Sequence, residues 1–145
     1  MPHISYSELK DWAFCAFYHK LTRVDKIDGF KGNAFTAFGT AVHSVCEKKL
    51  LQEEAGDDYF IQQFEECLEK LDDDIKIDQK LVQDMRSQGK EIIPEIEEAL
   101  DSYFEEYEVI SAEERLFEPI PGLEYDFKGF IDLVIQTPDG KYHII

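Results

Sequence analysis

Apolar residues recur every three or four positions through residues 1–108, a spacing typical of amphipathic α-helices. The clearest example is the segment AFTAFGTAVHSVCEKKLLQ. The apolar residues that recur at helical spacing are Phe35, Phe38, Val42, Val45 or Cys46, and Leu50. The segment is therefore predicted to form a helix that packs on a hydrophobic core through these side chains.

Shorter helices are predicted on either side of this segment. Ser5 and Glu8 have the spacing of a capping box, which predicts a helix start within ISYSEL. Two glycines and an asparagine mark 25–33 as a loop. The amphipathic segment DDYFIQQFEECLEKLD predicts a further helix, and another is expected over about 78–88. Pro94 is placed in the first turn of a separate, last helix.

The period changes after residue 108, where apolar and polar residues begin to alternate. The segments VISAEERLFEPI and DFKGFIDLVIQT are predicted to be strands, joined through PIPGLEY. The sequence TPDGK is typical of a hairpin turn, and YHII begins a further strand. We therefore expect an α+β domain in which helices come first and an antiparallel meander follows.

The chain has 145 residues, enough for one domain with a hydrophobic core, and 43% of them are hydrophobic, as in globular proteins. No apolar run approaches the roughly 20 residues that a membrane span needs. The first residues lack the pattern of a signal peptide. The three cysteines are widely spaced and form no C-x-x-C pair. A reduced, cytoplasmic protein with no membrane partner is therefore expected.

The formal net charge of −17 is unevenly distributed along the chain. Residues 1–50 carry seven Lys or Arg and five Asp or Glu, whereas residues 51–110 carry five and twenty. The excess of acid therefore belongs mainly to the middle segment, which is predicted to expose solvated helix faces. This composition argues against tight non-specific DNA binding, but it does not describe any single ligand-binding face.

His43 is the first candidate for chemistry. Gly39, His43 and Glu47 are spaced by four and would share one helix face. A glycine one turn before a histidine lets another backbone or a substrate approach closely. Two interpretations stay open: His43 is a functional group, or it is a partly buried histidine bonded to a carbonyl oxygen.

Asp132 is the second candidate, because it lies inside the nearly continuous apolar segment KGFIDLVI. An ionised carboxylate among buried residues is costly unless a metal, a cation or hydrogen bonds compensate it. The alternative is a solvent-facing carboxylate at a strand edge, but Phe130 and Val134 would share its face. We therefore predict a functional role for Asp132.

Together these segments resemble the PD-(D/E)XK nucleases, in particular the branch of RecB-type exonuclease domains and CRISPR-adaptation nucleases. SYSELKDWAFCAFYHKL resembles the opening helix of that branch, and FGTAVHSVCE resembles its Gly-x-x-x-His helix. AEERLF resembles its first strand, which bears a glutamate, and KGFIDLVI its Gly-x-Ile-Asp strand. The resemblance covers about 4–51 and 110–145. It implies a restriction-endonuclease-like α+β fold, in which N-terminal helices and an insertion of acidic helices over 57–108 are followed by an incomplete mixed β-sheet.

The resemblance also implies a site. His43 and Asp132 would be ligands of Mg²⁺ or Mn²⁺, and Glu113 or Glu114 would be the first-strand glutamate. Since strand alternation lets only one of these two face the site, we prefer Glu114. Glu47 is a weaker candidate for a residue that holds His43 in place.

In the family, an acidic residue and a lysine follow the strand that YHII begins here. The resemblance therefore predicts a truncated domain over 1–145 that is inactive, or nearly so, as it stands. The missing acid would be a third metal ligand, and the missing lysine would orient the attacking water.

Cys15 matches a cysteine that holds an iron–sulfur cluster in some members of the family. Position 16 is alanine where proline is usual there, and the alternative is a buried structural thiol. The chain also has basic residues, interleaved with aromatic ones such as Phe30, that are candidates for contacting a DNA strand. They are Lys20, Arg23, Lys26 and Lys31. A plain solvated face is the alternative for them, and the acidic helices of 57–108 are a candidate surface for a protein partner.

The function that the resemblance implies is that of a metal-dependent deoxyribonuclease, an exonuclease acting at DNA ends or on single strands. A bacterial or phage-infected cell, and a role in DNA repair or recombination, would fit it. One alternative is a non-catalytic nucleic-acid- or protein-binding module that keeps the fold. The other is an unrelated helical protein with an edge hairpin.

Overall fold

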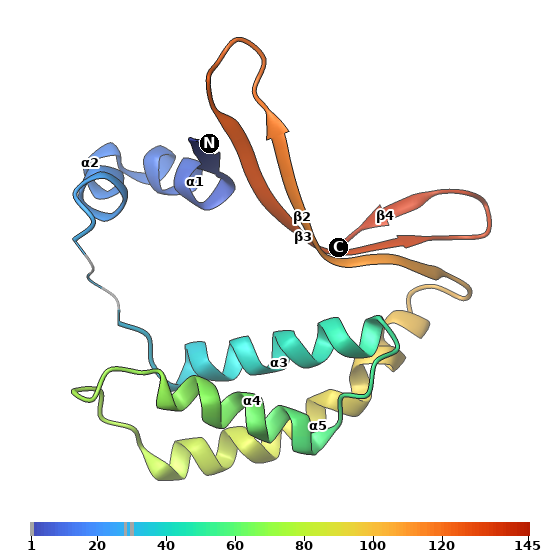
Figure 1. The fold of residues 1–145 in the computed structure, drawn as a ribbon. Coiled ribbons are helices and arrows are strands. Elements are labelled where there is room, and N and C mark those ends of the chain that lie inside the picture. Colours follow the sequence, from blue (N-terminus) through green and yellow to red (C-terminus); the bar gives the residue numbers. More distant parts are fainter. Residues whose placement is uncertain (1, 28, 30) are drawn as a thin grey trace.

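The structure is a computed structural model and describes residues 2–27, 29 and 31–145. Helices come first and most of the sheet follows, so the predicted α+β organisation is confirmed (Figure 1). The elements in chain order are β1 (His3–Ser5), α1 (Tyr6–Phe14), α2 (Ala16–His19), the π-helical turn η1 (Lys20–Val24), α3 (Ala34–Leu50), α4 (Asp57–Glu69), α5 (Gln79–Asp101), β2 (Glu108–Pro119), β3 (Asp126–Gln136) and β4 (Tyr142–Ile144).

Helices α3, α4 and α5 pack together and hold the main hydrophobic core. Asn33 starts α3, because its side-chain oxygen accepts hydrogen bonds from the backbone N–H groups of Phe35 and Thr36 at 2.9 and 3.1 Å. The buried face of α3 consists of small residues, namely Ala34, Ala37, Ala41 and Val45. The prediction that Phe35 is a core residue is wrong, since it is 64% exposed.

Aromatic rings fill the space that these small residues leave. Phe60 and Phe64 of α4 are fully buried and stack with their ring centroids 5.9 Å apart. Phe38 of α3 packs edge-on against both rings, at 5.8 and 5.7 Å. Close approach of α3 to α4 thus depends on alanine on one helix and phenylalanine on the other.

Helix α5 is a single element, so the prediction of two helices separated at Pro94 is wrong. Its buried residues are Val82, Met85, Gly89 and Ile93, which keep helical spacing up to the proline. Pro94 lacks the N–H that would bond to a carbonyl one turn earlier, a cost of about 3 kcal/mol in a helix interior. Tertiary packing of Ile93 and Ile96 on the core offsets that local preference.

Gly89 lies directly against the ring of Phe60, where a Cβ atom would overlap the ring. We expect Gly89→Ala to lower the free energy of unfolding by about 1–3 kcal/mol through overpacking, although alanine is the better helix former. Urea denaturation followed by circular dichroism measures this change.

The matched control for that substitution is Gly39→Ala on α3, where a Cβ atom would meet nothing within 4 Å. There the helix propensity of alanine acts alone, and stability should stay the same or rise by up to about 1 kcal/mol. A Gly89→Ala protein as stable as Gly39→Ala would contradict the packing of α5 on Phe60.

The sheet has four strands, with β3 at its centre. Strand β2 runs antiparallel to one side of β3, and the other side pairs with both β1 and β4. The short parallel strand β1 was not predicted from the sequence, and it joins β3 at Asp126–Lys128. β4 pairs further along β3, at Val134–Gln136.

The turn between β3 and β4 has the chemistry that TPDGK predicts. Gly140 has a φ of +80°, and its N–H donates to the carbonyl oxygen of Thr137 at 2.8 Å. Hydrogen bonds from Lys141 and Thr137 hold the pKa of Asp139 well below its usual range. The hairpin therefore begins β4 as expected.

The N-terminal segment from β1 to η1 contributes no buried residue to the core. Ser5 caps α1 as predicted, because its Oγ accepts from the N–H of Glu8 at 3.2 Å. The carboxylate of Glu8 instead bonds to Nε2 of His19 at 2.9 Å, which ties α1 to α2. Across the described residues, no helix has both the length and the apolar character to cross a membrane.

Candidate metal centre

Three side chains from three elements meet where α3 lies beside the sheet. They are His43 of α3, Glu113 of β2 and Asp132 of β3, and one ligand atom from each lies within 4.8 Å of the others. Nε2 of His43 and Oε1 of Glu113 are hydrogen-bonded to each other. The structure therefore brings together two residues that the sequence singled out and a glutamate that it left as an alternative.

The helical phase of α3 positions His43. Ala41 and Val45 point into the bundle core with no exposed surface. His43 lies two residues from each, which places it on roughly the opposite side of a helix with 3.6 residues per turn. Its side chain is 51% exposed and reaches the sheet instead of the core. The interpretation of His43 as a partly buried histidine bonded to a backbone carbonyl does not describe this position.

Glu113 reaches the cluster through an unusual backbone. It lies between the paired rungs Ala112–Leu133 and Glu114–Ile131 and has a φ of +53°. A non-glycine residue in this region costs of order 1–3 kcal/mol, and such strain concentrates at functional sites. Its carboxylate is only 24% exposed. The irregularity turns Glu113 towards His43 and Asp132.

The preferred residue Glu114 lies outside this cluster. It is exposed, and its carboxylate accepts a hydrogen bond from the hydroxyl of Ser111 at 2.6 Å. The preference rested on regular strand alternation, which the left-handed backbone at Glu113 interrupts. Glu113, and not Glu114, therefore contributes a carboxylate to the cluster.

Asp132 is exposed, so the prediction that its carboxylate is buried is wrong. The apolar residues that suggested burial lie just after it, at Leu133, Val134 and Ile135, which are buried. Phe130, which shares the face of Asp132 by alternation, is itself 56% exposed. Asp132 differs from an ordinary solvent-facing carboxylate at a strand edge because it lies close to His43 and Glu113.

The donor set suits a divalent cation. Two carboxylates on neighbouring strands repel each other when both are ionised, and one imidazole cannot neutralise both. Carboxylate oxygens are the ligands of Mg²⁺ and Mn²⁺, and an imidazole shifts the preference towards Mn²⁺. Burial raises the pKa of the Cys46 thiol, three residues along α3, so it stays protonated and competes poorly as a ligand.

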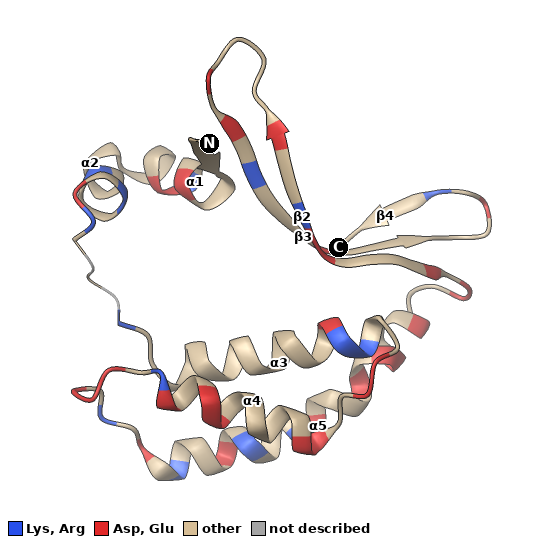
Figure 2. Cartoon of the chain, viewed as in Figure 1, with Lys and Arg blue, Asp and Glu red and all other residues tan. Residues whose placement is uncertain are grey.

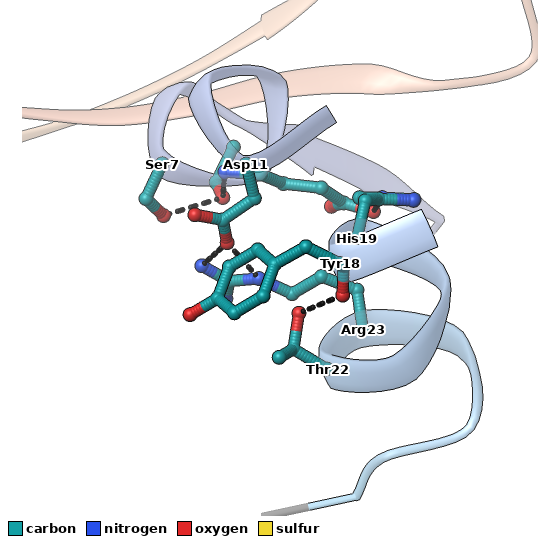
Figure 3. A network of polar contacts seen from close by, with 8 residues as sticks. Ser7, Asp11, Tyr18, His19, Thr22 and Arg23 are labelled. Carbon is teal, nitrogen blue, oxygen red and sulfur yellow. Dashed lines mark hydrogen bonds and ion pairs between the residues drawn. The ribbon is translucent and has the colours of Figure 1, made fainter. Parts of the chain in front are cut away.

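The basic residues predicted to contact DNA lie in and after η1, and three of them pair with carboxylates. Lys20 pairs with Asp25. Arg23 donates to Asp11 at 2.5 and 2.7 Å (Figure 3). Lys31 lies 3.0 Å from Asp74 and 3.1 Å from Asp72. No ion pair is found for Lys26 within the described part of the chain, and Phe30 lies outside the described residues.

Two further predictions concern surfaces away from the cluster. Cys15 lies exposed at the junction of α1 and α2, so the alternative of a buried structural thiol is wrong. Its role as an iron–sulfur ligand stays a prediction. Figure 2 shows acidic residues along α4 and α5. A protein partner for these helices also stays a prediction.

Comparison with known proteins agrees with this geometry. A family model described as the PD-(D/E)XK nuclease superfamily matches residues 3–145. No curated protein matches the chain significantly. The family match covers nearly the whole chain, including α3 and the strands that carry the cluster. The chain therefore belongs to the PD-(D/E)XK nuclease superfamily, whose members are metal-dependent nucleases.

Proposed function

We propose that the protein is a Mg²⁺- or Mn²⁺-dependent deoxyribonuclease that acts as an exonuclease on DNA ends or single strands. The observation that carries the proposal is the convergence of His43, Glu113 and Asp132 within 4.8 Å. The resemblance of SYSELKDWAFCAFYHKL and FGTAVHSVCE to RecB-type domains supports exonuclease action. Residues 1–145 would form a single nuclease-like domain, with the acidic helices of 57–108 as an insertion.

Each residue of the cluster has a defined role in this proposal. Asp132 and Glu113 would supply negatively charged oxygens and His43 a neutral nitrogen, so the charge of the two carboxylates matches that of a divalent cation. When bound, such an ion polarises a phosphoryl oxygen and lowers the pKa of a bound water. In the structure, the hydrogen bond between His43 and Glu113 holds these two side chains together at the cluster.

The proposal predicts which DNA molecules are cleaved. Incubated with Mn²⁺, the full gene product should degrade linear single-stranded DNA and leave circular single-stranded DNA of the same sequence intact. The reason is that an exonuclease needs an end. Gel electrophoresis of both substrates over time measures the difference, and EDTA should stop the reaction.

Two results would count against this function. Equal cleavage of circular and linear single strands would show that the protein is an endonuclease and not an exonuclease. Cleavage that continues unchanged in excess EDTA would show that the activity does not depend on the cluster.

A further inference from the structure

Four side chains beside the metal cluster alternate between cations and aromatic rings on one face of the sheet. In the β2–β3 pairing, Arg115 lies opposite Phe130, and Phe117 lies opposite Lys128. Directly opposite residues of antiparallel strands share a face, as do residues two apart on one strand. We call these four residues the cation–aromatic strip.

Each cation of the strip lies over a ring. The guanidinium carbon of Arg115 is 5.4 Å from the ring centroid of Phe117, and Nζ of Lys128 is 5.6 Å from that of Phe130. Neither cation forms an ion pair with any carboxylate that the structure describes. This differs from Lys20, Arg23 and Lys31, whose charges are compensated by carboxylates.

The strip starts at the metal cluster. Asp132 is two residues from Phe130 on β3 and shares its face, about 7 Å along the strand. Figure 2 shows basic residues on both β2 and β3, in the part of the hairpin that extends beyond α3. A chain of nucleotides with one phosphate at the cluster would therefore lie over Arg115 and Lys128 with its neighbouring units.

A pocket of about 590 Å³ continues the strip towards α1. Lys128 and Phe130 belong to both, and Ser5, Tyr6 and Ser7 also line the pocket. The two serine hydroxyls lie 3.0 Å apart, and Tyr6 is 63% exposed, with Nζ of Lys10 5.8 Å from its ring centroid. Hydroxyl donors, cations and exposed rings are the groups that bind phosphates and stack on bases.

We propose that the cation–aromatic strip and this pocket bind a single-stranded segment of DNA leading to the metal cluster. Arg115 and Lys128 contact its phosphates, and Phe130 and Tyr6 stack on its bases. A duplex keeps its bases paired inside and cannot use the exposed rings, so the strip favours unpaired strands. The inference rests on the proposed function in one respect, namely that the DNA strand leads towards the metal cluster. Binding of DNA to the strip does not itself require a bound metal ion.

The test is a binding measurement in EDTA, where cleavage is absent. Fluorescence anisotropy of a labelled oligothymidine gives the dissociation constant for the wild-type chain and for Phe130→Ala, which should bind about fivefold or more weakly. The double variant Arg115→Gln/Lys128→Gln removes two phosphate contacts. Its slope of log affinity against log salt should be shallower by about 1.4.

Matched controls separate the strip from general surface effects. Phe14→Ala removes a ring that is 84% exposed on α1 and does not line the pocket, and it should leave the dissociation constant unchanged. A duplex of the same length should bind equally to wild type and Phe130→Ala. Equal loss in Phe14→Ala and Phe130→Ala, equal sensitivity of duplex binding, or an unchanged salt slope would overturn the proposal.

The two proposals can fail separately. Phe130-dependent binding in EDTA, without any Mn²⁺-dependent cleavage by the full gene product, would support the strip and contradict the nuclease function. If Asp132→Asn abolishes cleavage but Phe130→Ala leaves the affinity for oligothymidine unchanged, the nuclease function would be supported and the binding strip would be overturned.

Discussion

Replacing Asp132 by asparagine is expected to abolish the stabilisation of the chain by Mn²⁺ and to reduce DNA cleavage by the full gene product about a hundredfold or more. A ligand that binds only the folded state stabilises it by about 2.7 kcal/mol at 100 times its dissociation constant. Losing one of two carboxylates should move that dissociation constant out of the accessible range. The expected reduction in cleavage rate reflects the loss of several kcal/mol of charge stabilisation in the transition state.

The same variant distinguishes a metal ligand from a structural residue. Without metal, Asp132→Asn removes the repulsion between the carboxylates at positions 132 and 113, so its melting temperature should equal or exceed that of wild type. Addition of Mn²⁺ should raise the melting temperature of wild type and leave that of Asp132→Asn unchanged. Differential scanning fluorimetry with and without Mn²⁺ gives both values for each protein.

Glu114→Gln is the matched control, because it removes an adjacent carboxylate that bonds to Ser111 outside the cluster. It should keep the full response to Mn²⁺, whereas Glu113→Gln should lose it. A retained response in Asp132→Asn, or a lost response in Glu114→Gln, would contradict the arrangement of ligands. His43→Ala should also lose the response to Mn²⁺, since it removes the imidazole of the same cluster.

Local pattern was sufficient for most elements but not for how they pack. The period of three to four residues correctly predicted α3 and α4, and alternation correctly predicted β2 and β3. It failed at Pro94, where a local helix signal was overridden by the burial of Ile93 in the tertiary core. It also missed β1, because three residues that pair with a strand more than 120 positions later leave no periodic signal.

The residues of the site were partly accessible from the sequence, for a physical reason. His43 and Asp132 stand out because a polar group in an apolar periodic segment is uncommon. The choice between Glu113 and Glu114 depended on one backbone angle, and a φ of +53° at a glutamate has no signature in the sequence. The pairing of Arg23 with Asp11 likewise arises only when α1 and η1 fold against each other.

The second large effect is expected in the helical core. Phe64→Ala should lower the free energy of unfolding by about 3–5 kcal/mol, because the side chain is fully buried and its removal leaves a cavity. The stacked contact with Phe60 and the edge-on contact with Phe38 would be lost as well. Urea denaturation gives the value, and Phe64→Leu, which leaves a smaller cavity, provides a measurable variant if the alanine protein is unfolded.

Phe35→Ala decides whether the core has been identified correctly. Phe35 was the first core residue of α3 by periodicity, yet it is 64% exposed, and so its replacement should change stability by no more than about 0.5 kcal/mol. A large loss in Phe35→Ala with a small loss in Phe64→Ala would mean that α3 presents Phe35, and not its alanines, to the bundle. That rotation would also turn His43 away from Glu113 and Asp132, so the core measurement tests the orientation on which the metal centre depends.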